Sequence, residues 1–195
     1  MREDNSKLPM PGDMLLFEAK YCQPCDFIIG NLQRFFDGRA GHVATIVHYF
    51  KETNTVLVFD ALMSGLAFRE YDWNEKSKAL IRPHGLTLET AQVEDKLVEY
   101  FQGITDKRYP IDELIEVGVK AFLRRTLLGM VIPRGIPSNS NRMICSALAH
   151  QAMLHLIPEF TCTVGRGSLT PEETTPNDLY FCKETYTVKD WDVIL

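Results

Sequence analysis

The chain has 195 residues, enough for one domain with some excess over a typical size of about 150. Its 45% apolar and 24% charged residues are typical of a globular protein and exclude collagen-like or low-complexity chains. A net charge of -5 provides no basic surface for nucleic acid or for an anionic membrane, so we expect neither partner.

Residues 1–8 are polar and lack the apolar core of a signal peptide. No window reaches the roughly 20 apolar residues of a membrane span. We therefore expect a cytoplasmic protein in which thiols stay reduced, although a leader that had been removed would leave no trace. The five cysteines are then better interpreted as five free thiols than as two disulfides and one remaining thiol.

The first half of the chain is predicted to be mainly β. A turn at residues 9–12 precedes a short strand at 13–17, and the apolar spacing of residues 27–36 fits a helix. β-Branched and aromatic residues dominate segments 42–50 and 55–59, which we interpret as strands joined by a hairpin loop at 51–54. Segments 66–71 and 78–82 are expected to add two more strands.

The hydrophobic period then changes to that of helices. Residues 90–102 and 143–157 are predicted to be helices that end before Gly103 and Pro158. Between them we expect a helical insertion at about residues 110–140. The last third is expected to return to the sheet at 179–181 and 187–194. Strands followed by helices indicate a single α+β domain over residues 1–195, with an antiparallel sheet packed against helices.

Cys145 is a candidate nucleophile because it lies in the first turn of the predicted helix 143–157. Ser140 or Asn141 can cap the free amides there. The partial positive charge of a helix N-terminus favours a thiolate, and its N–H groups point to where an oxyanion would form. The alternative is that Cys145 is a small buried apolar side chain.

A cysteine nucleophile needs a base, and His42 is the preferred candidate among five histidines. It opens the most β-like segment, on which His48 has the same parity and could face the same side. Asp60 follows the apolar run 56–59 on the next strand. With a loop centred near residues 51–54, His42 and Asp60 lie diagonally on one face, so Asp60 can reach the far ring nitrogen of His42 and fix its tautomer.

Five stretches, in this order, resemble the permuted NlpC-type papain-like cysteine amidases and peptidases, the YiiX-like group. The first resembles the opening strand, the second the histidine strand and the third the strand with the third polar residue. The fourth resembles the start of the nucleophile helix, and the fifth the tail motif. They are Gly12-Asp13-Met14-Leu15-Leu16, Gly41-His42-Val43-Ala44, Val58-Phe59-Asp60-Ala61, Ile144-Cys145-Ser146-Ala147-Leu148 and Thr175-Pro176-Asn177-Asp178-Leu179-Tyr180.

This resemblance covers about residues 11–181 and implies a circularly permuted papain-like fold. It implies Cys145 as nucleophile, His42 as base and Asp60 as the residue that orients the base, although other polar residues are more usual than Asp at the third position. Tyr109 loosely matches a tyrosine that helps to frame the oxyanion site in relatives. The implied activity is hydrolysis of an amide bond in a peptide or an acylated small molecule, and no cofactor or metal is expected.

Other functions are compatible with the same residues. A lipid acyltransferase or thioesterase of the related lecithin-retinol group shares the permuted order, and a non-catalytic binding module would keep only the fold. The Cys22-Gln23-Pro24-Cys25 motif could belong to a zinc or redox site. Its second ligand pair is missing, because Cys162 and Cys182 are twenty residues apart and look structural.

Overall fold

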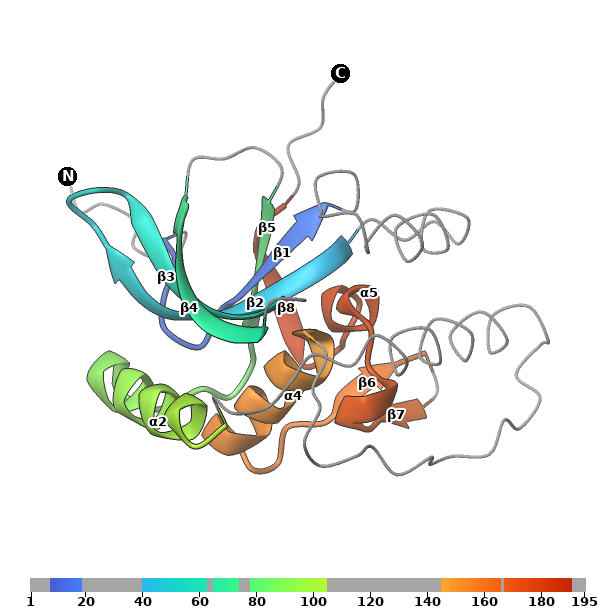
Figure 1. Cartoon of the computed structure of the whole chain (residues 1–195). Coiled ribbons are helices and arrows are strands. Elements are labelled where there is room, and N and C mark those ends of the chain that lie inside the picture. The colour runs from blue at the N-terminus through green and yellow to red at the C-terminus, as the bar shows by residue number, and fades with distance from the viewer. Residues whose placement is uncertain are drawn as a thin grey trace, which may run out of the picture.

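The computed structural model describes residues 8–18, 40–62, 65–73, 78–104, 145–165 and 167–190. Within these ranges a six-stranded sheet packs against helices (Figure 1). The strands of the sheet are β1 (Met14–Glu18), β2 (Ala40–Phe50), β3 (Thr55–Leu62), β4 (Gly65–Asp72), β5 (Lys78–Pro83) and β8 (Thr185–Lys189). The helices are α2 (Thr90–Gln102), α4 (Cys145–Leu156), α5 (Pro176–Tyr180) and the 3-10 helix η3 (Pro171–Glu173), and β6 (Cys162–Val164) pairs with β7 (Gly167–Leu169) in a small separate sheet.

The large sheet has the order β4-β3-β2-β1-β5-β8, and all its neighbouring strands are antiparallel. The predicted α+β class with an antiparallel sheet packed against helices is therefore confirmed. The five strands predicted at 13–17, 42–50, 55–59, 66–71 and 78–82 are present; the first is shifted by one residue, and the other four have slightly longer bounds. The helix at 27–36 and the insertion at about 110–140 lie outside the described residues.

One predicted element is wrong. Residues 179–181 were expected to be a strand, but Leu179 and Tyr180 are the last residues of helix α5 and Phe181 is its C-cap. Thr175 caps this helix with a reciprocal capping box to Asp178, and Pro176 occupies its first turn. The capped start, rather than the apolar run of Leu179 and its neighbours, decides the structure here. The last strand, β8, ends at Lys189, and residues 191–195 are outside the described part.

The large sheet has two buried faces. Helices α2 and α4 cover one face, where the sheet residues Met14, Leu16 and Phe59 pack against Phe101 and Met153 of the helices (Figure 1). The second face buries a cluster made by the sheet itself and by residues that flank it, namely Leu15, Ala44, Ile46, Val56, Val58, Trp73 and Leu80.

The second face is buried because the sheet curls. Strands β4 and β8 are the two edges, and five strand spacings would separate them by about 24 Å in a flat sheet. Yet the Nζ atom of Lys189 on β8 lies 4.6 Å from the ring centroid of Trp73, just beyond β4, and 3.4 Å from its carbonyl oxygen. The curled sheet therefore has an interior, which the second cluster fills.

Candidate active site

His42 and Asp60 are in contact, as expected, although a register shift between Ile46 and His48, and not the hairpin loop alone, puts them on the same face. The Nε2 atom of His42 lies 2.6 Å from Oδ1 of Asp60, and both side chains are buried, with 6% and 0% of their residue surface exposed. Strand β2 carries the histidine and β3 the aspartate. Because Asp60 takes Nε2, the other ring nitrogen, Nδ1, remains for a second partner.

Cys145 also interacts with the His42 ring. This residue is the first of helix α4, where the chain enters the helix beside the sheet, and it is 5% exposed. Both a hydrogen bond and the charge of Cys145 act on the His42 ring. The structure thus brings together Cys145, His42 and Asp60, three of the four predicted site residues. The fourth, Tyr109, lies outside the described residues.

The surroundings of His42 favour its protonated form. Burial lowers the pKa of His42, but the charges of Cys145 and Asp60, together with their hydrogen bonds, raise it more strongly, so the pKa lies well above 6.5. An imidazolium beside Cys145 is the natural counterion of a thiolate. The carboxylate of Asp60 fixes the ring orientation from the opposite side, which is the role of the third member of a catalytic triad.

Two residues with no predicted role complete this arrangement. Tyr71 on β4 donates a hydrogen bond of 2.8 Å to Oδ2 of Asp60, so both carboxylate oxygens have a partner. Asn177 on α5 holds the start of β2: its amide donates to the carbonyl of Ala40, and its carbonyl accepts from the Ala40 N–H, both at 3.0 Å. Asn177 stands in the tail motif, which is the signal that could have identified it.

The other histidines lie apart from this site. A β-bulge between Ile46 and His48 interrupts the alternation of β2, so the expectation that His48 could face the same side as His42 is wrong. The Nδ1 atom of His48 instead lies 2.9 Å from Oε1 of Glu94 on helix α2. His150 is buried on the far side of α4, where its Nδ1 lies 2.8 Å from the hydroxyl of Thr174.

The thiols in the described part of the chain, Cys145, Cys162 and Cys182, are all free. Cys162 and Cys182 are buried near one another, and Cys182 donates to Oε2 of Glu184 at 3.2 Å. The motif Cys22–Cys25 lies outside the described residues. Among the described side chains, no three His, Cys, Asp or Glu gather in a group that could hold a metal ion. None of the helices within these ranges has the length and apolarity that crossing a bilayer requires.

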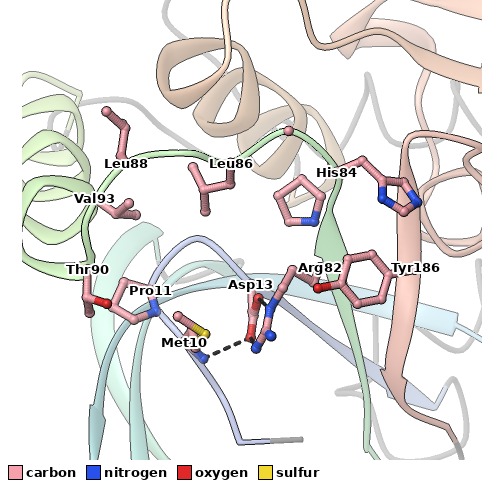
Figure 2. Close-up of a pocket in the computed structure, with 12 residues that line it drawn as sticks. Met10, Pro11, Asp13, Arg82, His84, Leu86, Leu88, Thr90, Val93 and Tyr186 are labelled. Carbon is pink, nitrogen blue, oxygen red and sulfur yellow. Dashed lines mark hydrogen bonds and ion pairs between the residues drawn. The ribbon is translucent and has the colours of Figure 1, made fainter. Parts of the chain in front are cut away.

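A separate pocket of about 270 Å³ lies at the other end of β1 (Figure 2). An ion pair between the buried Asp13 and the partly buried Arg82 forms part of its wall: Nε and Nη2 of Arg82 donate to the two carboxylate oxygens of Asp13 at 2.7 and 2.8 Å. The side chains of Met10, His84 and Tyr186 surround the same space. Cys145, His42 and Asp60 do not line this pocket.

Comparisons with known proteins identify no relative: no protein family, no curated protein and no solved structure matches the chain.

Proposed function

We propose that the protein is a papain-like cysteine hydrolase of the permuted NlpC type that cleaves an amide bond. The observation that carries the proposal is the buried His42 ring, which interacts with Cys145 on one side and bonds to Asp60 on the other. A buried histidine with only a structural role also needs a hydrogen-bond partner for each ring nitrogen. It has no need for those partners to be a thiol and a carboxylate. This pairing is the arrangement that activates a cysteine nucleophile.

The reaction follows from these three groups. His42 accepts the proton of the Cys145 thiol, and the sulfur attacks the carbonyl carbon of the substrate. The backbone N–H of Cys145, at the start of helix α4, donates to the oxyanion that forms. The imidazolium of His42 then gives its proton to the leaving amine, and water, deprotonated by His42, hydrolyses the thioacyl enzyme.

The first test combines an electrophilic thiol probe with a panel of amide and ester substrates. Cys145→Ala is expected to abolish turnover, a loss of about a thousandfold or more, because no other group supplies the nucleophile. His42→Ala should slow alkylation of Cys145, measured by mass spectrometry of the peptide that contains it. Cys182→Ala is the matched control, since it removes a buried thiol that does not contact His42 in the described structure, and it should retain full turnover.

Two results would contradict the proposal. One is alkylation of Cys145 at the same rate with and without His42. The other is turnover that survives Cys145→Ala. Transfer of the acyl group to an added alcohol or amine faster than to water would assign the same site to an acyltransferase instead of a hydrolase.

A further inference from the structure

Lys78 is a buried cation at the start of β5. It has no exposed surface, although lysine is almost never fully buried in proteins. Its Nζ atom donates to the carbonyl oxygen of Asp72 at 3.0 Å. A methionine would fill the same volume without the cost of desolvating a charge, so the charge itself requires an explanation.

The two aromatic rings beside Lys78 are the rings that contact the candidate site. Its Nζ lies 4.8 Å from the ring centroid of Tyr71 and 5.5 Å from that of Phe17. Tyr71 donates to Asp60, and the Phe17 ring lies 5.5 Å from the ring of His42, centroid to centroid. The rings of Tyr71 and Phe17 also contact each other, at 5.0 Å. Lys78 is therefore linked to His42 and Asp60 through these two rings.

The charges in this part of the sheet interior explain why a cation is useful there. Asp60 is completely buried. While His42 is neutral, the imidazole ring that Asp60 contacts carries no full positive charge. Lys78 supplies one whether the proton is on Cys145 or on His42. Other charged groups on this face are Arg69, two residues before Tyr71 on β4, Lys189 over Trp73, and the ion pair of Asp13 and Arg82 at the start of β1. A buried carboxylate stays ionised only when such partners compensate for the lost water.

We propose that Lys78 and Tyr71 are positioning residues of the Cys145–His42–Asp60 site, which orient Asp60 toward His42 and place a positive charge near the pair from inside the curled sheet. This inference rests on the proposed function. Tyr71 transmits the effect by its hydrogen bond to Asp60, and the cation over its ring strengthens the phenol as a donor.

The test is the pH dependence of Cys145 alkylation by iodoacetamide, followed on the peptide that contains Cys145. Lys78→Met removes the cation and retains the length of the side chain. In this variant, the acidic limb of the pH profile of Cys145 alkylation is expected to move to higher pH by on the order of one unit. The reason is that both anions, Asp60 and the Cys145 thiolate, lose a nearby positive charge. Tyr71→Phe removes only the hydroxyl group that bonds to Asp60 and should move the same limb in the same direction.

Lys189→Met is the matched control. Lys189 also places Nζ over an aromatic ring and beside a carbonyl oxygen of the opposite sheet edge, but that ring is Trp73, which has no contact with Asp60 or His42 among the described interactions. Its pH profile should equal that of the wild type. An equal shift in Lys189→Met would mean that closure of the sheet, rather than the charge behind Asp60, causes the effect, and would overturn the inference.

Each remaining outcome also decides the question. An unmoved acidic limb in folded Lys78→Met overturns the role of Lys78. If Lys78→Met does not fold, the nearly isosteric Tyr71→Phe decides, because an unmoved limb there breaks the link to Asp60. Failure of the proposed function gives a different result. In that case the alkylation rate of Cys145 would be the same with His42 and with His42→Ala, whatever residue stands at position 78 or 71.

Discussion

His42 and His150 are both buried, yet their pKa values move in opposite directions. Each loses hydration, which lowers the pKa of a histidine. At His42 the adjacent Cys145 and Asp60 outweigh that loss, whereas burial dominates at His150, for which only the distant charge of Glu172 acts in the other direction. A buried imidazole thus becomes an acid–base group only where charged partners accompany it.

His150 should make the protein sensitive to mild acid. Burial lowers its pKa to about 4, below the 6.5 of an unfolded histidine, so between these values the unfolded chain binds more protons. The stability that neutral His150 provides is complete above about pH 6.5 and is lost as the pH falls toward about 4. The slope from one such group is at most about 1.4 kcal/mol per pH unit.

Urea unfolding near neutral pH and near about pH 5 measures this effect. His150→Gln is the control, because glutamine can still bond to Thr174 but does not titrate in this range. The free energy of unfolding should fall more steeply with acid in the wild type than in His150→Gln. Parallel pH dependences in the two proteins would show that His150 is not the group responsible.

At the scale of elements, the short helix α5 holds the start of the strand that carries His42. Asn177 satisfies both backbone groups of Ala40, two residues before His42. The helix itself is set by its cap, in which the Asp178 N–H bonds to the Thr175 hydroxyl. Asn177 of this five-residue helix therefore determines where β2 begins. The start of β2 in turn determines the position of the His42 ring relative to Cys145.

Asn177→Ala should weaken both folding and reactivity. Two buried backbone groups of Ala40 lose their partner, which costs about 1–3 kcal/mol of unfolding free energy for each unsatisfied group. Because β2 is then free to shift, the alkylation rate of Cys145 should also fall. Thr175→Ala is the comparison on the same helix: it should cost about 1 kcal/mol through the lost cap and leave alkylation nearly unchanged. Equal alkylation rates in both variants would contradict a role of Asn177 in placing His42.

The contact between His42 and Asp60 was expected from strand alternation, but alternation and loop length alone do not produce it. The pairing of Phe50 with Thr55 would place the two side chains on opposite faces, and the bulge between Ile46 and His48 brings them to the same face. The role of Lys78 could not be predicted, since Lys78 on β5 meets the ring of Tyr71 on β4 only through the curl of the sheet, which no local pattern specifies. The bulge that redirects His48 has no sequence signal of its own. Helix α5, in contrast, was predictable: Thr175, Pro176 and Asp178 are typical of a helix start.

At the scale of the whole molecule, the two buried charge clusters lie at opposite ends of one strand. Asp13 immediately precedes β1, while Phe17, which contacts His42, is near its end, and four residues of strand span about 13 Å. The ion pair of Asp13 and Arg82 joins the start of β1 to the end of β5 beside the pocket of Figure 2. We therefore expect this pair to stabilise the fold without tuning the site.

Arg82→Met tests that separation. It leaves Asp13 buried without its counterion, and the cost should be about 3 kcal/mol or more of unfolding free energy. The alkylation rate of Cys145 and its pH profile should stay at wild-type values at temperatures where the variant is folded. Thermal unfolding and the alkylation assay on the same sample measure the two effects, and a shifted pH profile would show that the two clusters are coupled.

The order of the strands also affects how the site comes together during synthesis. His42 and Asp60 lie on neighbouring strands near the beginning of the chain, and Cys145 follows about a hundred residues later. A nascent chain that ends just before Cys145 already contains every strand of the large sheet except β8, and chains fold from the N-terminus as they emerge from the ribosome. His42 and Asp60 are thus made well before Cys145, so the thiol reaches His42 only after the strands that orient the ring have been synthesised.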